Sequence, residues 1–383
     1  MTENRKKVLI ACDSSRTLLD FRGKLIEELI KKNDVYVFTP KISQQHVRER
    51  LKIMNVTVYE NALNGSNVSI FSDLKYIFKL YNLIKIIKPD IFFPYTFKPV
   101  IYGTILARLC KINCITPMLT GLGYNFTDNG AKKKLVSTIT KFLLKFSLSA
   151  NKRIRVIFQN KDDYNKLLET KIIGAKHQAF VVNGSGVDLS HYDYSEPKIS
   201  QISFLMISRL INSKGVKEFY EAAKIVRSKF PDVKFKLIGS FDDNIDSITT
   251  ELYAEIQSGD IIEYIGQVDD VRSYIRDASI LVLPSYYGEG IPRCILEGMA
   301  MGRAIITSNS VGCRETIDAS PSGINGFLVP IKNIPILASR MEYYINHTKD
   351  IILYGINGRN FAKKKFDVNL VNSEMLKIMN VGY

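Results

Sequence analysis

Short apolar runs alternate with helical stretches along almost the whole chain. Runs such as KVLIA (7–11) and IFFPYT (91–96) predict strands, and apolar positions spaced three or four residues apart predict helices, as over 73–87. Continuous apolar strands alternating with helices are typical of a parallel sheet covered on both faces. The polar stretch HYDYSEPKIS (191–200) interrupts the alternation, which restarts at ISFLMIS (202–208). The pattern therefore predicts an α/β protein with two doubly wound, Rossmann-like domains facing across a cleft.

The same breaks predict the domain boundaries. We expect an N-terminal domain at residues 1–190 and a second domain at 200–365, because the polar stretch between them has no strand or helix pattern. Residues 366–383 are predicted as a C-terminal helix that packs back on the N-terminal domain. With 383 residues, the chain is long enough for two full cores.

Cysteine usage and the absence of long apolar runs indicate the compartment. The five cysteines are odd in number and include no CxxC pair, and no signal peptide precedes the first strand. No apolar run reaches 18 residues, so no membrane span is predicted. These features favour a reducing, cytoplasmic setting.

The charge is unevenly distributed. The net charge is +15, and residues 1–200 hold 32 Lys and Arg against 17 Asp and Glu, whereas the remainder is balanced. A basic half beside a neutral half suggests an anionic partner: nucleic acid, acidic lipid or a phosphorylated acceptor.

The stretch 284–318 holds the strongest candidate chemistry. A strand end, a loop rich in tyrosine and glycine, and a helix that Pro292 could start place Glu289 and Glu297 eight positions apart. At about 1.5 Å per helical residue, their backbones lie about 12 Å apart or less. That span suits two ends of one extended ligand and is too long for an acid/base pair acting on one bond. Backbone N–H groups at the helix N-terminus between the two carboxylates favour an anion. The pattern therefore predicts a ligand with a phosphate in the middle and a hydroxyl-rich group at each end, one for each carboxylate.

Further polar candidates follow other predicted strands, where ligands of doubly wound sheets bind. Arg209 and Lys214 follow the strand at 202–208, just before a helix. In the first domain a glycine turn begins at Thr120, where backbone could approach a ligand closely, although tight-turn geometry alone is an alternative reason for its glycines. Glu315 is expected either to bond near the site or to support a helix.

Two groups of motifs carry a family resemblance. The Glu289-x7-Glu297 spacing within EGIPRCILEGMAMGRAIITSNSVGCRE, preceded by SRLINSKGVKEFYEAA, resembles glycosyltransferase family 4, which are retaining enzymes of the GT-B fold. The segments 95–109 and 120–130 resemble bacterial members that build capsule, O-antigen or lipid-linked glycans. Among these, the pattern is most similar to N-acetylgalactosaminyltransferases that act on undecaprenyl-diphosphate sugars.

The resemblance implies roles for these residues. Arg209 and Lys214 would neutralise the donor diphosphate, Glu297 would accept hydrogen bonds from the ribose hydroxyls, and Glu289 would face the donor sugar, so Arg209, Lys214 and Glu289 are the catalytic candidates. The remaining donor-binding candidates are Gly290, Ile291, Pro292, Arg293 and Val268. The acceptor or phosphate candidates are Ser14, Ser15, Arg16, Lys98, Thr120, Gly121 and Gly123.

Two absences from the sequence shape the expected mechanism. No Asp-x-Asp motif occurs, so we expect metal-independent transfer with no cofactor beyond a nucleotide-sugar co-substrate, UDP-linked by resemblance. None of the four histidines lies in a loop expected near the reaction centre. We therefore expect a front-face mechanism in which the leaving phosphate oxygen takes the acceptor proton.

The resemblance implies transfer of a sugar, an N-acetylhexosamine such as GalNAc, to an undecaprenyl-diphosphate-linked saccharide in surface polysaccharide or glycan assembly. The partners implied are a UDP-sugar and a polyprenyl-diphosphate-linked acceptor, and not nucleic acid; the expected location is the inner face of the cell membrane, as a peripheral protein. An epimerase-like GT-B enzyme and a non-catalytic basic membrane-binding scaffold are the alternatives.

The segment Lys132–Arg155 is predicted to meet an anionic membrane surface, because it holds eight cations and no acid over 131–155. Its helix is expected to close the core with one stripe and to present lysines, with Leu144 and Leu148 beside them, on the opposite face. The expected core stripe is Leu135, Ile139, Phe142, Leu143 and Phe146.

Overall fold

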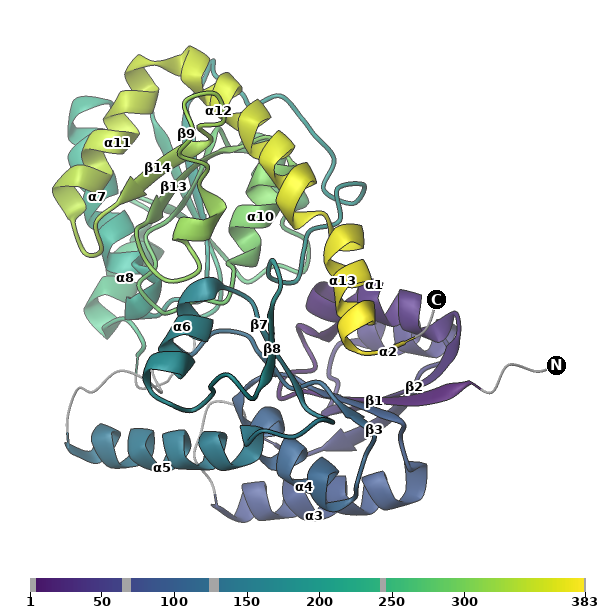
Figure 1. Ribbon diagram of the computed structural model, residues 1–383. Coiled ribbons are helices and arrows are strands. Elements are labelled where there is room, and N and C mark those ends of the chain that lie inside the picture. Colours follow the sequence, from purple (N-terminus) through teal and green to yellow (C-terminus); the bar gives the residue numbers. More distant parts are fainter. Residues whose placement is uncertain (1–4, 64–69, 124–130, 242–245, 382–383) are drawn as a thin grey trace. The chain divides into compact units, whose positions relative to one another are not determined.

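The chain folds into two compact units. The computed structural model describes residues 5–63, 70–123, 131–241 and 246–381, and for residues 70 and 131–136 it describes the backbone only (Figure 1). Unit 1 comprises Met1–Ser185 and Asn369–Tyr383, and unit 2 comprises Gly186–Val368.

Unit 1 contains two parallel sheets. A five-stranded sheet has the order β3-β2-β1-β4-β5, and a three-stranded sheet has the order β6-β7-β8. The bridges Tyr95–Met118 and Ile115–Ile154 connect the two sheets. The strands are β1 (Lys6–Ala11), β2 (Asn33–Pro40), β3 (Thr57–Asn61), β4 (Ile91–Pro94), β5 (Cys114–Ile115), β6 (Met118–Leu119), β7 (Arg155–Phe158) and β8 (Gln178–Val181).

Helices cover both faces of these sheets, as alternating side chains of β1 show. Val8 and Ile10 pack in one core with helices α1, α2 and α13, whereas Leu9 and Ala11 pack in a second core with α3, α4, α5 and α6. The helices of unit 1 are α1 (Leu18–Ile30), α2 (Gln45–Ile53), α3 (Ile70–Ile87), the π-helical turn η1 (Pro99–Gly103), α4 (Thr104–Leu109), α5 (Ala131–Leu148), α6 (Lys161–Glu169) and α13 (Val368–Ile378). A doubly wound sheet, as the alternation predicts, is the result.

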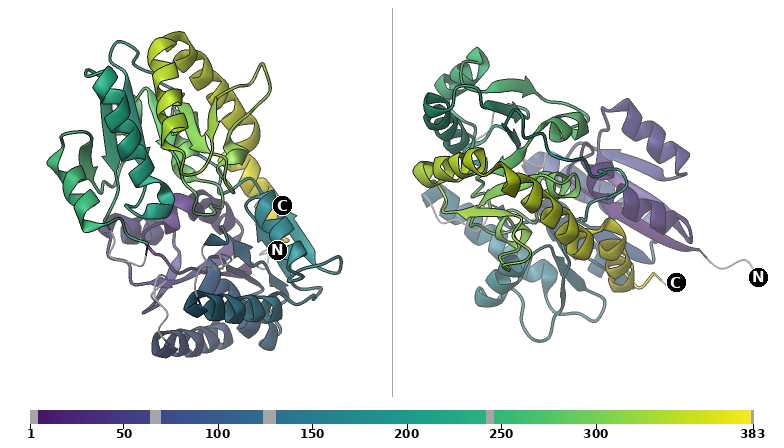
Figure 2. Two further views of the ribbon diagram at one scale, coloured as in Figure 1. Left: turned by 90° about the vertical axis from the view of Figure 1, so that its left-hand side faces the viewer. Right: turned by 90° about the horizontal axis from the view of Figure 1, so that it is seen from above.

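Unit 2 is one parallel sheet of six strands in the order β11-β10-β9-β12-β13-β14, surrounded by helices (Figure 2). The strands are β9 (Ser203–Ile207), β10 (Lys234–Ile238), β11 (Glu263–Gly266), β12 (Ile280–Leu283), β13 (Ala304–Ser308) and β14 (Gly326–Val329). The helices are η3 (Asn212–Lys214), α7 (Val216–Lys229), α8 (Thr250–Ser258), α9 (Arg272–Asp277), α10 (Arg293–Ala300), η4 (Arg314–Thr316), α11 (Ile334–Asn346), α12 (Thr348–Phe361) and η5 (Ala362–Phe366).

The polar stretch expected to link the domains belongs to unit 2, which begins at Gly186. The Val187 N–H donates to the Phe366 carbonyl over 2.8 Å, and the Arg359 guanidinium donates to the Tyr192 carbonyl over 2.7 Å. After η5, helix α13 joins the core of unit 1 through Val371 and other apolar residues. The sequence-based boundaries at 1–190, 200–365 and 366–383 remain a proposal.

The orientation of α5 differs from the prediction. Leu144 and Leu148 are fully buried in the core of unit 1, whereas Ile139, Phe142 and Phe146 are exposed. The side chain of Leu135 lies outside the described residues, as do those of Lys132, Lys133 and Lys134. The helix carries two apolar stripes about half a turn apart, and helical periodicity alone does not say which one meets the core. No helix among the described residues is both long and apolar enough to cross a membrane.

Candidate functional site

The candidate residues of unit 2 gather where the strand order reverses. The chain leaves β9 in one direction toward β10, and it returns on the other side of β9 as β12. Loops diverge at such a switch point, so the carboxyl ends of the two strands leave a crevice for ligands. Arg209 and Lys214 follow β9, and the loop with Glu289 follows β12. The fold thus brings together residues 75 positions apart in the sequence.

Lys214 and Glu289 form a buried ion pair. The Lys214 ammonium donates to Glu289 Oε1, and the side chains of Lys214 and Glu289 are only 15% and 11% exposed. The hydroxyl of Ser285 donates to the same oxygen over 2.9 Å. Burial disfavours the ammonium, but the charge of Glu289 and the hydrogen bond to it outweigh burial and raise the pKa of Lys214. Lys214 is therefore a cation at neutral pH, and its side chain is largely shielded from solvent.

Arg209 joins this group through an aromatic ring. The Tyr287 ring centroid lies 5.2 Å from the Lys214 ammonium and 6.0 Å from the Arg209 guanidinium carbon. Arg209 is exposed, whereas Lys214 is not. The structure thus places two cations near the same ring, with Lys214 largely buried and Arg209 facing solvent. Two neighbouring cations of this kind could bind one anion between them.

Glu297 belongs to a separate network. It lies in α10 and is 6% exposed, and its Oε1 accepts hydrogen bonds from the Tyr192 hydroxyl over 2.9 Å and from Arg293 Nε over 2.6 Å. Burial, with the neighbouring charge of Glu297, raises the pKa of Tyr192, so its hydroxyl stays protonated and donates. The two carboxylates thus have different partners, and the structure does not pair them with each other.

The loop between the two carboxylates is held by close backbone contact. Gly290, Ile291 and Pro292 are buried, and Pro292 precedes the first turn of α10. Gly312 lies against this loop so closely that a Cβ there would come within 2.3 Å of the Gly290 carbonyl oxygen. Val268, the remaining donor candidate, follows β11 and is partly buried against the core of unit 2.

Gly215 is expected to be essential for this geometry. It has φ +78°, and an added Cβ would lie 2.3 Å from the Pro284 carbonyl oxygen at the end of β12. Gly215→Ala should lower affinity for an anionic ligand of Lys214 at least tenfold, measured by calorimetric titration, because the clash displaces η3 from the Glu289 loop. Gly259→Ala is the matched control, since Gly259 has φ +76° and nothing within 4 Å of the added Cβ. Equal affinities for the two variants would contradict the expectation.

In unit 1 the loops after β1, β4 and β6 meet at one edge of the sheets. Ala11 pairs with Pro94, and Tyr95 pairs with Met118, so the residues that follow these positions lie at the carboxyl ends of neighbouring strands. Three sets of predicted acceptor or phosphate residues lie in these loops. They are Ser14, Ser15 and Arg16 after β1, Lys98 after β4, and Thr120, Gly121 and Gly123 after β6.

These candidates differ in their local roles. The Ser15 hydroxyl donates to the Lys41 carbonyl over 3.0 Å, and Arg16 is exposed. Lys98 donates to Asp73 over 2.8 Å, and both side chains are mostly buried. Gly121 has φ +116° and Gly123 has φ +51°, so the turn after β6 requires glycine-type backbone.

Three further polar residues at this edge were not predicted from the sequence. Asp13 directly follows Cys12 at the end of β1, and burial raises the pKa of its carboxyl. Asp73 accepts from Tyr102 as well as from Lys98, over 3.0 Å and 2.8 Å. Asp13 could have been found as the first polar residue after a buried strand. Asp73 and Tyr102 lie in helices, where the sequence pattern does not show whether a polar side chain is buried against a partner or faces solvent.

Two other predictions can be placed. Glu315 lies in η4, and Lys365 Nζ donates to its carboxylate over 3.4 Å and to its carbonyl over 3.1 Å, so it anchors the helical segment after α12. Among the residues described, no group of three or more His, Cys, Asp or Glu could hold a metal ion.

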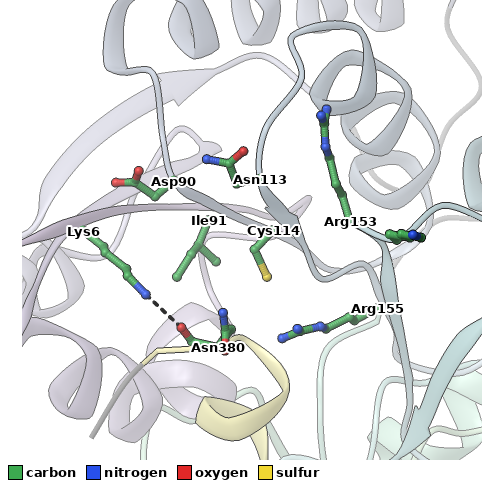
Figure 3. A pocket seen from close by; sticks show the side chains of 9 residues that line it. Lys6, Asp90, Ile91, Asn113, Cys114, Arg153, Arg155 and Asn380 are labelled. Carbon is green, nitrogen blue, oxygen red and sulfur yellow. Dashed lines mark hydrogen bonds between the residues drawn. The ribbon is translucent and has the colours of Figure 1, made fainter.

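A cavity of about 230 Å³ in unit 1 lies at the opposite, amino-terminal edge of the sheet (Figure 3). Lys6 and Arg155, which line it, donate to the carbonyls of Asn380 and Ile378 over 3.1 and 2.7 Å. These cations meet the carbonyl end of α13, where positive charge is favoured. The cavity is therefore explained by the docking of the C-terminal helix, and it contains none of the predicted site residues.

Comparisons with known proteins find two family matches. The family described as "Glycosyl transferase 4-like" matches residues 7–160, and the family described as "Glycosyl transferases group 1" matches residues 201–347. Together the two matches cover most of the chain.

Curated relatives match over nearly their full length. The N,N'-diacetylbacillosaminyl-diphospho-undecaprenol alpha-1,3-N-acetylgalactosaminyltransferase of Campylobacter jejuni is 26% identical over 94% of this chain and 95% of its own. The capsular polysaccharide biosynthesis glycosyltransferase CapM of Staphylococcus aureus is 24% identical over 98% of this chain and 97% of its own.

Solved structures share the fold. HepE of Anabaena, solved in complex with UDP-glucose, matches with a TM-score of 0.77 at 16% identity, over 99% of this chain and 100% of that one. Sucrose-phosphate synthase from Thermosynechococcus elongatus matches with a TM-score of 0.78 at 17% identity, over 98% and 99% of the two chains. At such identities the likeness concerns the fold.

Proposed function

The chain belongs to the glycosyltransferases, with a glycosyltransferase 4-like domain followed by a group 1 domain, and we propose that it is a retaining, metal-independent enzyme of surface glycan assembly. It transfers a sugar, an N-acetylhexosamine such as GalNAc, from a UDP-sugar to an undecaprenyl-diphosphate-linked saccharide. This choice of substrates is supported by the Campylobacter jejuni relative, which has a matching length and whose name specifies an undecaprenol-linked acceptor and N-acetylgalactosamine.

One observation carries the proposal: the cations Lys214 and Arg209 lie on the Tyr287 ring at the switch point of unit 2. A departing nucleoside diphosphate gains negative charge as the glycosidic bond breaks, and preorganised cations stabilise that charge. In this proposal Lys214 and Arg209 bind the donor diphosphate. Glu289, held by Lys214 and Ser285, faces the donor sugar.

The rest of the donor lies along α10 in the proposal. Glu297 accepts from the ribose hydroxyls, and its orientation is already set by Arg293 and Tyr192. The N–H groups from Gly290 to Arg293 serve the sugar and the phosphates at the helix N-terminus, and backbone near Val268 lies beside the base. A UDP-sugar is supported by the neighbour solved with UDP-glucose.

The proposed reaction takes place on one face of the sugar. The bond from the anomeric carbon to the β-phosphate oxygen breaks as the acceptor oxygen forms its bond to the same face of that carbon. The acceptor proton passes to the leaving phosphate oxygen, so no side chain is required as a base. Arg209 and Lys214 take the place of a divalent cation in this scheme.

Unit 1 supplies the acceptor site in this proposal. The candidates Ser14, Ser15, Arg16, Lys98 and the turn after β6 lie at the carboxyl edge of its sheets. Asp13 joins them, because a buried carboxyl at that edge suits a hydrogen bond from a sugar hydroxyl. Since the acceptor is lipid-linked, the enzyme works as a peripheral protein on the inner face of the cell membrane, with Lys132–Arg155 toward anionic lipid.

The decisive experiment is a donor screen. UDP- and GDP-sugars are offered with a synthetic polyprenyl-diphosphate-linked saccharide, and products are identified by mass spectrometry and by the anomeric coupling constant in proton NMR. We expect one UDP-N-acetylhexosamine to give an α-linked product at an unchanged rate in EDTA, because the cations of the protein replace the metal. An inverted product or loss of activity in EDTA would contradict the proposed mechanism.

Two alternatives make different predictions. An epimerase-like enzyme needs acid and base groups at one carbon, whereas Glu289 and Glu297 have separate partners. A non-catalytic basic scaffold would not bind UDP. We expect UDP at 100 times its Kd to stabilise the protein by about 2.7 kcal/mol in a thermal-shift assay. No shift at millimolar UDP would favour the scaffold.

A further inference from the structure

We propose that the outer faces of α3 and α5 in unit 1 form a docking surface for an anionic lipid bilayer, into which their exposed aromatic side chains insert. The inference deepens the proposed function and rests on it, because the lipid-linked acceptor is the reason for this protein to bind a membrane. It extends the expected membrane contact from the cations of one segment to an apolar surface built by two helices. We call one set of exposed apolar residues of these helices the aromatic face: Phe71, Leu74, Phe78, Tyr81, Ile139, Phe142 and Phe146.

The α3 part of the aromatic face is a regular stripe. Phe71, Leu74, Phe78 and Tyr81 follow one another at spacings of three, four and three residues, so they lie on one side of the helix. Phe71 is 81% exposed and Phe78 is 66% exposed, while Tyr76 and other residues on the opposite side are buried. A helix that already buries one apolar side in its own core and exposes a second one presents surface for another partner.

The α5 part repeats the arrangement. Ile139, Phe142 and Phe146 are spaced three and four residues apart, and Phe142 is 69% exposed. The core contact of α5 is made by Leu144 and Leu148 on the other side. The side chains that fold the protein and the side chains of the aromatic face are therefore different residues, so substitutions in the face leave the core unchanged.

Helix α4 connects the two parts. It contacts both α3 and α5, and the Arg108 guanidinium donates to the Phe146 carbonyl over 2.6 Å. Leu109, the last residue of α4, is 70% exposed. The two longer helices run along the same outer side of unit 1 in the view of Figure 1 and in the left view of Figure 2. The two parts of the aromatic face thus lie on helices that both pack against α4 in one compact unit.

The charges around the aromatic face fit anionic lipid. The only acid in α3 is Asp73, which is buried against Lys98 and Tyr102, and α5 contains no acid. The exposed charged side chains described on the two helices are all lysines: Lys75, Lys79, Lys85 and Lys145.

Phenylalanines, a tyrosine and lysines without exposed acids are the composition of an interfacial helix. Its apolar side chains enter the boundary between headgroups and acyl chains, and its lysines reach the anionic headgroups. The Lys85 ammonium already lies 5.7 Å from the Tyr81 ring centroid, so one residue pair combines both contacts. A second copy of the chain would instead place lysines against lysines, which is unfavourable. The charge pattern therefore selects lipid as the occupant.

The chain offers a direct reporter, because it contains no tryptophan. Phe142→Trp and Phe78→Trp each introduce one fluorophore into the aromatic face, and Ile53→Trp introduces one into α2, where Ile53 is 75% exposed in the other helix layer of unit 1. With vesicles of one-third phosphatidylglycerol, we expect a blue shift and quenching by brominated acyl chains at positions 142 and 78 only. Absence of both signals at both positions would overturn the proposal.

Sedimentation with the same vesicles tests the energetics. Phe142→Ser with Phe146→Ser should lower the partition coefficient at least tenfold, and each of Lys75→Gln and Lys79→Gln should lower it about fivefold. Ile53→Ser with Leu370→Ser, in exposed positions of α2 and α13, is the matched control and should bind like the unchanged chain. Equal binding to phosphatidylcholine vesicles would contradict the role of charge. A serine variant that binds normally but loses self-association in light scattering would assign the face to a second copy.

An activity measurement separates this inference from the proposed function. The serine variant should turn over a short, water-soluble prenyl-diphosphate acceptor at the unchanged rate, and it should lose at least tenfold in rate with the full-length acceptor in vesicles. Failure of the unchanged chain with both acceptors would overturn the proposed function alone, since vesicle binding needs no turnover. Equal rates for the variant and the unchanged chain in vesicles would overturn the docking surface.

Discussion

Replacing Lys214 by methionine is expected to lower kcat/KM for sugar transfer by about 10²–10³, because in the proposed function the leaving diphosphate loses a preorganised cation. The change also leaves the carboxylate of Glu289 with Ser285 as its remaining partner in the Lys214–Glu289–Ser285 group. A buried charge without its counter-charge destabilises the fold, so the free energy of unfolding should fall as well. Steady-state kinetics and denaturant unfolding measure the two effects separately.

A double variant distinguishes catalysis from structure at this position. Glu289→Gln added to Lys214→Met removes the carboxylate charge that Lys214 balanced, so stability should return toward that of the unchanged chain. Transfer should stay lost, because the cation that is proposed to face the diphosphate is still missing. Lys214→Arg, which keeps the charge, should retain more activity than either. Near-normal turnover by the double variant would show that Lys214 only balances Glu289, and the proposed diphosphate site would be wrong.

Replacing Arg303 by methionine is expected to lower the free energy of unfolding of unit 2 by at least about 3 kcal/mol. Arg303 is fully buried, and its guanidinium donates to the carbonyls of Arg276, Ala278, Ser195 and Met301. Methionine fills much of the volume but removes the guanidinium donor of these carbonyls. The Met301 carbonyl keeps the Ser195 N–H, 3.3 Å away, as a donor. Each buried carbonyl that is left unpaired costs about 1–3 kcal/mol. Burial lowers the pKa of Arg303 to about 10, so the group is still charged at neutral pH.

Guanidinium unfolding with a spectroscopic probe of unit 2 checks this expectation. Arg272→Met is the control, because the ion pair of Arg272 with Asp270 is largely exposed and such pairs contribute at most about 1 kcal/mol. UDP affinity of the Arg303 variant below its unfolding transition should be unchanged, since Arg303 touches none of the proposed ligand groups. Equal midpoints for the two variants would mean that other groups satisfy the four carbonyls.

The local pattern was sufficient to predict most strands and the residues that follow them. Buried parallel strands read as continuous apolar runs, and the polar residue after such a run lies at the edge where ligands bind. Arg209, Lys214 and Glu289 were predicted in this way, and the structure places them at one switch point. Helix α2 was not predicted, because it buries only Val47 and Leu51 and has a weak apolar stripe.

Pairing between distant residues could not be predicted. Nothing local to Tyr192 indicates that its hydroxyl reaches Glu297, 105 positions away, and nothing near Asp73 indicates a buried pair with Lys98. Arg303 follows helix α10 and is among the most buried side chains, and nothing local to it indicates this. Such contacts depend on strand order and helix packing, and a short local stretch of sequence determines neither of them.

The sequence by itself determined that this is a doubly wound α/β protein of two domains, and that its candidate anion-binding residues follow β9 and β12, because periodicity and strand-end position are local properties. Only the tertiary structure decided that Glu289 pairs with Lys214 and that the Tyr192 hydroxyl reaches Glu297. It also decided which of two apolar stripes of α5 enters the core. The physical reason is the same in each case: whether a side chain is buried depends on the residues, distant in the sequence, that pack against it. Phe142 stays exposed because Leu144 and Leu148 of the same helix fill the core.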